Sequence, residues 1–361
     1  MTLLLTNDDL ASLISPAEFV DRLDRAYRDY AVSSGICAPR IDVQSAALGP
    51  DKNYQLGLAV GMSGSYAALR VKSDVVMRRI VGGVARKDKY CTEPGKYLGL
   101  ILLFEAATGA LLAILHDGLL QKMRVGADSA LGVRYMARRD CGVLGLLGSG
   151  GMARAHVAAV ASECVLQRVQ VFSPNPENRE AFAREMAELH GLDVVAVDAP
   201  EKIYNDADIV SSCASAIGPV IFGRFLKPGL HITCIGGMLD DEASDRVDAA
   251  LRFGLAPAPA EAPELRLEAE CMTFAEGGGK AAHGGTARYA NIPSSRRVEF
   301  SELLTDPSRG RTDDRQITFS ERGNIHGLQF AAVAGLLYER ARAANVGQEL
   351  AADQFLQSIR N

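Results

Sequence analysis

The sequence GVLGLLGSGGMARAHVAAVA spans residues 142–161 and joins an apolar run, a glycine turn and a stretch of good helix formers. A strand, a glycine turn and a helix in this order let backbone N–H groups approach a pyrophosphate, and the helix N-terminus attracts the same negative charge. Gly148 is expected at the tight turn and Gly150 beside the phosphate. The stretch therefore predicts a dinucleotide-binding turn, whose candidate cofactor-binding residues are Gly148, Ser149, Gly150, Gly151 and Met152. Because glycine-rich turns are common, an ordinary loop is the alternative.

Strands and helices continue to alternate after this turn. Arg168–Phe172 predicts a second strand, and Asn175 and Pro176 predict the N-cap and first residue of a helix that runs to His190 and stops at Gly191. Shorter apolar runs predict three more strands, at residues 194–197, 209–213 and 231–235. The pattern indicates an α/β fold with a Rossmann-type, doubly wound parallel sheet.

The end of the second strand bears on the choice of cofactor. In dinucleotide folds an acidic residue at this point binds the ribose hydroxyls of NAD. This chain reads Phe172-Ser173-Pro174-Asn175, with Arg179 one helical turn further on and no acid at the strand end. The pattern favours NADP, with NAD still possible, and makes Ser173, Asn175 and Arg179 candidate cofactor-binding residues. For Ser173 and Asn175 the alternative is ordinary helix capping.

Residues 1–135 follow a different pattern. Ser15 and Pro16 predict the start of an amphipathic helix that ends near Val32, and a second helical stretch covers residues 123–136. Alternating runs predict strands at residues 41–45, 54–60, 67–71, 97–104 and 111–115, the last two joined by a hairpin turn. Lys89 falls in a predicted loop between two of these strands. The first part of the chain is therefore expected to form an α+β unit with an antiparallel sheet.

Composition restricts the class of protein. The chain has 361 residues, of which 48% are hydrophobic and 23% charged, enough for two units with apolar cores. The net charge of −5 is mild and mixed along the chain, so neither nucleic acid nor a membrane is an expected partner. The N-terminal apolar run is too short for a secretory signal and no stretch is long enough to span a bilayer, which predicts a cytoplasmic protein. The seven cysteines and six histidines are dispersed, so no metal site is expected.

A series of short motifs resembles the ornithine cyclodeaminase/mu-crystallin superfamily over essentially the whole chain. In chain order they are Pro39-Arg40, Lys72, the hairpin FEAATGALLAIL at 104–115, Arg124, LGLLGSGGMARAH at 144–156, Gly310-Arg311-Thr312-Asp313 and Gly327-Leu328-Gln329. The resemblance implies a homodimer whose N-terminal sheets join across the interface. It also implies that residues 1–135 plus 327–361 form the substrate-binding and dimerisation domain, and that residues 136–326 form the dinucleotide-binding Rossmann domain.

The resemblance also implies roles for individual residues. Arg40 and Arg124 would bind a substrate carboxylate through their planar guanidinium groups. Lys72 would hydrogen-bond the substrate or donate a proton if burial and the arginines lower its pKa. Cyclodeaminases carry an acid/base aspartate where this chain has Met238, so Asp240 or Asp241 is expected to replace it unless that role is lost.

Three further residues are candidates for the cofactor site by the same resemblance. Ser212 and Ser215 would contact the nicotinamide ribose, and Asn324 would complete the pocket from the other side. The glycine-rich segment at residues 271–297, which includes Lys280 and His283, is either a lid over the site or a surface insertion.

These features predict an NAD(P)H-dependent reductase of imino acids, or an amino-acid dehydrogenase, that acts at the α-carbon of a small carboxylate substrate. Two alternatives stay open. One is an ornithine-type cyclodeaminase that releases ammonia with catalytic NAD, and the other is a cofactor-dependent protein that binds small ligands, as mu-crystallin does. The missing aspartate at position 238 weighs against the cyclodeaminase.

Overall fold

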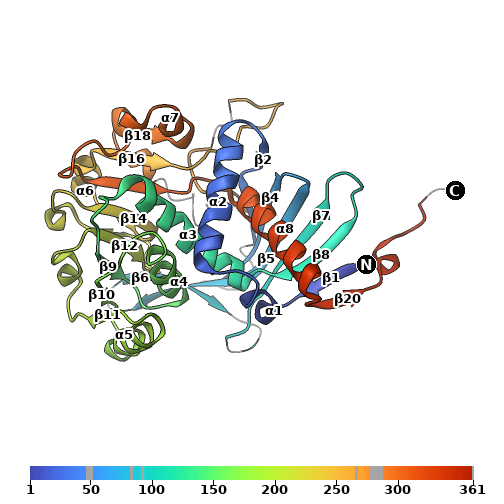
Figure 1. The fold of residues 1–361 in the computed structure, drawn as a ribbon, viewed down its shortest axis with the longest axis horizontal. Helices are drawn as coiled ribbons and strands as arrows, with labels where there is room; N and C mark the ends of the chain where they lie inside the picture. The colour runs from blue at the N-terminus through green and yellow to red at the C-terminus, as the bar shows by residue number, and fades with distance from the viewer. Residues whose placement is uncertain are drawn as a thin grey trace.

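The computed structural model describes residues 1–45, 52–81, 84–90, 93, 95–264, 267–275 and 288–359. In these residues the chain forms two large sheets, one at each end of the molecule, with long helices between and over them (Figure 1). The α/β fold with a Rossmann-type parallel sheet after an N-terminal α+β part is therefore confirmed.

The first sheet is built mainly from the N-terminal part of the chain. Its strands are β1 (Thr2–Leu5), β2 (Gly35–Cys37), β3 (Arg40–Ser45), β4 (Lys52–Ser63), β5 (Tyr66–Val81), β6 (Val84–Tyr90), β7 (Leu98–Glu105), β8 (Leu111–His116), β17 (Cys271–Ala275) and β20 (Gln348–Leu350). The main order is β17-β3-β4-β5-β7-β8-β1-β20, while β2 pairs with β4 and β6 with β5. Neighbours are antiparallel except for the pairs β1–β8 and β17–β3. All five strands predicted before residue 135 are present.

Two strands of this sheet differ from the predictions. Lys89 lies in β6, paired with β5, rather than in a loop. β17 comes from the part of the chain predicted to belong to the Rossmann domain, yet it pairs with β3 so that Cys271 lies opposite Arg40. A β-prone segment that meets an open strand edge extends the sheet wherever it lies in the chain. Of the glycine-rich segment, Lys280 and His283 lie outside the described residues.

The second sheet is entirely parallel. Its strands are β9 (Val143–Leu147), β10 (Arg168–Phe172), β11 (Asp193–Ala196), β12 (Ile209–Cys213), β14 (His231–Gly236), β16 (Ala249–Arg252), β18 (Arg297–Glu299) and β19 (Thr318–Glu321), in the order β11-β10-β9-β12-β14-β19-β16-β18. The direction of winding reverses beside β9. In open α/β sheets ligands bind at such a switch point, outside the carboxyl ends of the strands.

Short and medium helices follow the strands of the second sheet. They are α4 (Gly151–Val160), α5 (Pro176–His190), α6 (Asp241–Arg246) and α7 (Phe300–Thr305). Asn175 caps α5 and Gly191 ends it at φ +66°, as predicted. Apart from these strands, β13 (Pro219–Ile221) and β15 (Met238–Leu239) form a small two-stranded sheet.

Three long helices lie between and over the two sheets. They are α2 (Pro16–Ala31), α3 (Gly118–Met136) and α8 (His326–Ala344), with the short α1 (Asn7–Ala11) near the N-terminus. α3 packs against α4 of the Rossmann part, and α8 packs on β4 and β5 of the first sheet (Figure 1). One apolar core runs through these helices and both sheets. Within the described residues, no helix combines the length and apolar character needed to cross a bilayer.

Candidate functional site

The glycine turn has the geometry that a dinucleotide requires. Gly148 has φ +108°, and a Cβ there would lie 2.9 Å from the Cys213 carbonyl oxygen, so only glycine fits. Gly150 is the N-cap of α4, and a Cβ on it would meet no atom within 4 Å. The first turn of α4 has no side-chain cap on its N–H groups, and a Cβ at Gly151 would lie 3.2 Å from the Lys122 side chain. These residues fit the diphosphate of a dinucleotide.

The candidate residues for the adenosine end lie beside this turn. The Ser149 hydroxyl donates to the Ser173 hydroxyl oxygen at 2.9 Å, and Arg179 Nη1 donates to the Ser173 carbonyl at 3.0 Å. Asn175 Oδ1 accepts from the amide of Asn178, so the side chain of Asn175 caps α5. Ser173 and the Arg179 guanidinium thus stand at the strand end where NAD-binding folds carry an acidic residue.

Two of the predicted side chains, Asp240 and Ser212, make structural contacts. Asp240 caps α6, and its Oδ1 accepts from the amides of Gly223 at 2.9 Å and Ala243 at 2.7 Å. The fully buried Ser212 hydroxyl donates to the Gly236 carbonyl at 2.7 Å and so links β12 to β14. These hydrogen bonds engage Asp240 and Ser212 within the protein.

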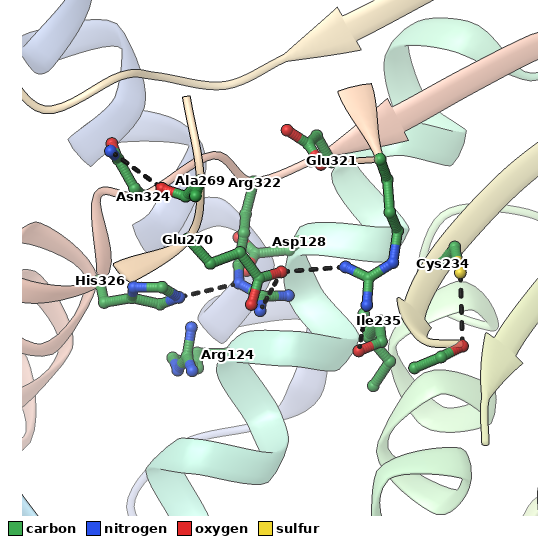
Figure 2. Close-up of polar contacts among 12 residues, drawn as sticks. Arg124, Asp128, Cys234, Ile235, Ala269, Glu270, Glu321, Arg322, Asn324 and His326 are labelled. Atoms are coloured by element: carbon green, nitrogen blue, oxygen red, sulfur yellow. Dashed lines mark hydrogen bonds and ion pairs between the residues drawn. The ribbon is translucent and has the colours of Figure 1, made fainter. Parts of the chain in front are cut away.

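The Asn324 amide is fully engaged as well. It accepts from the amide of Ala256 at 2.5 Å and donates to the carbonyls of Leu267 at 2.9 Å and Ala269 at 3.4 Å (Figure 2). Through these contacts Asn324 holds in place the segment that leads to β17. Ser215, the remaining candidate, follows the carboxyl end of β12.

One face of the first sheet carries a series of charges. Alternate residues of β3 and β5 supply them: Arg40, Asp42, Arg70, Lys72 and Asp74. Arg40 forms a bidentate pair with Asp42 at 2.9 and 2.8 Å. In the register of the sheet, Gly57 lies between Asp42 and Lys72, and a Cβ at Gly57 would come within 2.9 Å of Asp42. The glycine leaves room for the charged side chains on both sides of it.

Lys72 is only 8% exposed and lies within this charged face. Asp74 forms ion pairs with Lys72 and with Lys89 of β6, the latter at 3.2 Å. Burial, then the positive charges of Lys89, Arg40 and Arg70, lower the pKa of Lys72 well below that of a free lysine. A lysine of lowered pKa can exchange a proton near neutral pH.

Arg124 projects from α3 and is 3% exposed. Its Nη1 donates to Gln329 Oε1 at 2.7 Å, its Nε and Nη2 donate to Gln121 Oε1, and it lies over the Phe330 ring at 5.1 Å. Burial and the nearby Arg322 lower the pKa of Arg124 to about 9, so it is charged at neutral pH. Among the described residues its hydrogen-bond partners are the neutral amides of Gln121 and Gln329, and a buried cation held in this way is well suited to an anionic ligand.

Several residues near Arg124 were not predicted from the sequence. Arg70 lies 5.2 Å from the centroid of the same Phe330 ring and pairs with Asp117. Asp128, one turn after Arg124, accepts hydrogen bonds from Tyr27 and Gln329, and its burial raises its pKa to about 6. Only helical spacing from Arg124 could have suggested Asp128, because its partners come from distant parts of the chain.

A cavity lies where α3 meets the carboxyl ends of β14 and β19. It is lined in part by Asp128, Ser129, Ile235, Glu270, Glu321 and Arg322. His326 is adjacent: its Nε2 accepts from Arg322 Nε at 3.1 Å, and burial, Arg124 and Arg322 lower its pKa (Figure 2). The cavity therefore lies beside the buried Arg322 at the carboxyl edge of the parallel sheet.

The fold and this arrangement define a two-sheet protein with a dinucleotide-type turn and a buried cationic pocket. The model of the ornithine cyclodeaminase/mu-crystallin family matches residues 81–345, and the chain belongs to that family. It is 28% identical over 250 residues to iminosuccinate reductase of Paracoccus denitrificans (strain Pd 1222), covering 69% of this chain and 72% of the relative.

Solved structures of the same fold agree. Δ(1)-pyrroline-2-carboxylate reductase of Thermococcus litoralis, in complex with NADH and L-proline, matches with a TM-score of 0.74 at 22% identity over 97% of this chain and all of that one. A lysine cyclodeaminase matches with a TM-score of 0.71 at 22% identity over 96% of this chain and 94% of that one. At 22% identity these two matches show a shared fold and no more.

Proposed function

We propose that the protein is an NAD(P)H-dependent reductase of imino acids, working in reverse as an amino-acid dehydrogenase. The observation that carries the proposal is the buried, charged Arg124, which lies one helical turn before Asp128 of the cavity lining. Two relatives named above are reductases of substrates that pair a carboxylate with a C=N bond.

The side chains of the site have separate roles in binding and proton transfer. Arg124 binds the substrate carboxylate, while Arg40, held by Asp42, adds positive potential beside it. Lys72, whose lowered pKa lets it gain and lose a proton, hydrogen-bonds the substrate or transfers a proton near the reacting carbon. The nicotinamide supplies or accepts the hydride when it is bound.

Consumption of NADPH and NADH tests this proposal directly. Purified protein is mixed with each cofactor and either preformed cyclic imines or 2-oxo acids with ammonia or methylamine, and absorbance at the nicotinamide band is followed. We expect turnover that Lys72→Ala abolishes. Ammonia release from ornithine or lysine with NAD, without net cofactor turnover, would instead establish a cyclodeaminase. Cofactor binding without either reaction would establish a ligand-binding protein.

We further propose that NADP is the preferred cofactor. Of the arginines on α5, Arg179 is the one that hydrogen-bonds Ser173, which in turn pairs with Ser149. In the sequence, Asn175 lies between the end of β10 and Arg179. Arg179→Ala should weaken NADPH binding about tenfold and leave NADH binding within about twofold, since one charge-assisted contact to a phosphate is lost. Fluorescence titration of both cofactors measures this. Arg184→Ala, later on the same helix, is the control; equal losses for NADPH and NADH would contradict the preference.

A homodimer joined through the first sheet is also part of the proposal. The face opposite the charged one exposes Val43 and Val60, which are 43% and 45% exposed, and Phe274 of β17, which is 53% exposed. Phe274 lies directly opposite Val43 in the register. Apolar side chains gathered on an open sheet face favour burial against a second copy.

A further inference from the structure

Glu270 has a position in the fold that its sequence neighbourhood did not reveal. After β16 ends at Arg252, the chain leaves the second sheet and joins the first one as β17, where Cys271 lies opposite Arg40. Glu270 is the residue immediately before that strand. The crossing from one sheet to the other therefore fixes Glu270 at the boundary between the sheets, where it lines the cavity.

Two arginines hold one oxygen of this carboxylate. Glu270 Oε1 accepts from Arg288 Nη1 and from Arg322 Nη2, each at 3.0 Å (Figure 2). Among the described residues, none donates a hydrogen bond to Glu270 Oε2. Glu270 is thus held in place through one oxygen and has its other oxygen available.

Arg288 links this carboxylate to the end of β14. Its Nη2 donates to the Ile235 carbonyl at 3.2 Å and its Nε to the Gly237 carbonyl at 2.8 Å. Gly237 directly precedes Met238, the position at which the family resemblance places an acid/base aspartate. The Arg288 guanidinium therefore bridges the Glu270 carboxylate and the backbone next to Met238, which stands in place of the family's aspartate.

The ionisation state distinguishes Glu270 from the other acids of the cavity. Burial alone would raise the pKa of Glu270, but Arg322, Arg288 and Arg40 together hold it below the usual value. Burial raises the pKa of Asp128 and of Glu321, and Asp128 is already engaged with Tyr27 and Gln329. Glu270 is therefore the cavity acid whose pKa is lowered rather than raised, and it is a carboxylate at neutral pH.

We propose that Glu270 binds the positively charged nitrogen of the substrate, the iminium of an imino acid or the ammonium of an amino acid. The inference rests on the proposed function and names the group that recognises the nitrogen end, while Arg124 takes the carboxylate end. In reduction, a hydride from the reduced nicotinamide adds to the carbon of the protonated C=N bond and the π electrons move to nitrogen, which becomes a neutral amine. Glu270 is unchanged by this step and acts by keeping the imine protonated.

Binding of matched ligands tests the inference without turnover. L-proline is compared with tetrahydrofuran-2-carboxylate, and L-alanine with L-lactate, by calorimetric titration of protein saturated with NADPH, which cannot accept a hydride from the amine; each pair differs in having an ammonium or a neutral oxygen. Wild-type protein should bind the amine at least about tenfold more tightly, and Glu270→Gln should lose that difference through weaker amine binding only. Glu270→Asp should recover part of it.

Glu268→Gln is the matched control. Glu268 lies two residues earlier, pairs with Arg252 and has a side chain that is 43% exposed, so this variant should keep the wild-type preference. Wild-type protein that binds neither amine better than its oxygen analogue, or a Glu270→Gln variant that keeps the preference, would overturn the inference.

The pH dependence of reduction gives a second measurement. A carboxylate beside the imine raises the pKa of the bound imine, so in Glu270→Gln the alkaline limb of kcat should move to lower pH by about one unit. An unmoved limb would refute the role of Glu270 in protonation. Failure of the wild-type protein to reduce any imine while the ligand preference persists would reject the proposed reaction and keep Glu270 as the nitrogen-binding group.

Discussion

Arg124→Ala should lower kcat/KM for imine reduction by at least about 30-fold and up to several thousand-fold. The guanidinium is buried, and removing one partner of a buried, hydrogen-bonded charge pair costs about 2–5 kcal/mol. Arg124→Lys should recover only a small part, because an ammonium cannot present two parallel donors to a carboxylate. Steady-state kinetics with NADPH and a cyclic imino acid measure both variants.

The control for this prediction separates binding from folding. Arg139, at the exposed end of the connection after α3, carries the same charge away from the cavity, so Arg139→Ala should leave kcat/KM within about twofold. Arg124 also contacts Gln329 of α8, so thermal unfolding of each variant is followed in parallel. Unchanged kcat/KM in a folded Arg124→Ala protein would show that Arg124 serves only to join α3 to α8.

The Rossmann part was predictable because its signals are local. Apolar runs bounded by turn residues predicted β10 and β12 with the observed bounds, and Asn175 and Gly191 marked the ends of α5 through their own backbone and side-chain chemistry. Each of these elements is specified by about a dozen consecutive residues. The parallel, doubly wound arrangement followed from the alternation of strands and helices.

Pairings between distant segments were not predictable in the same way. β17 pairs with β3 although more than two hundred residues separate them in the chain. No local sequence pattern predicts the sheet edge with which a short strand pairs. The polar site shows the same limit. Asp240 and Asn324 are candidate site residues in the sequence, which does not show that Asp240 also binds the amide of Gly223 and Asn324 that of Ala256. Glu270 is marked only by the three arginines that surround it, and these come from separate parts of the chain.

Gly327→Ala should strongly destabilise the fold. A Cβ at Gly327 would lie 1.9 Å from the Val60 carbonyl oxygen and 2.5 Å from the Gly61 amide nitrogen, and both atoms belong to the backbone of β4. The approach is equally close from the strand, because a Cβ at Gly61 would lie 2.3 Å from the carbonyl carbon of Gly327. Backbone cannot swing aside as a side chain can, so we expect a loss of about 3 kcal/mol or more in the free energy of unfolding.

The same substitution should also damage the site, because α8 carries the groups that hold Arg124. Gln329 and Phe330 follow Gly327 within one turn, and lifting α8 from β4 moves both away from the guanidinium. Chemical denaturation, with Gly218→Ala as the control, measures the loss of stability, since a Cβ at Gly218 meets no atom within 4 Å. If Gly327→Ala unfolds at the wild-type denaturant concentration, α8 is not held by this contact. A large stability loss with unchanged KM for the imino acid would show instead that Arg124 keeps its position without α8.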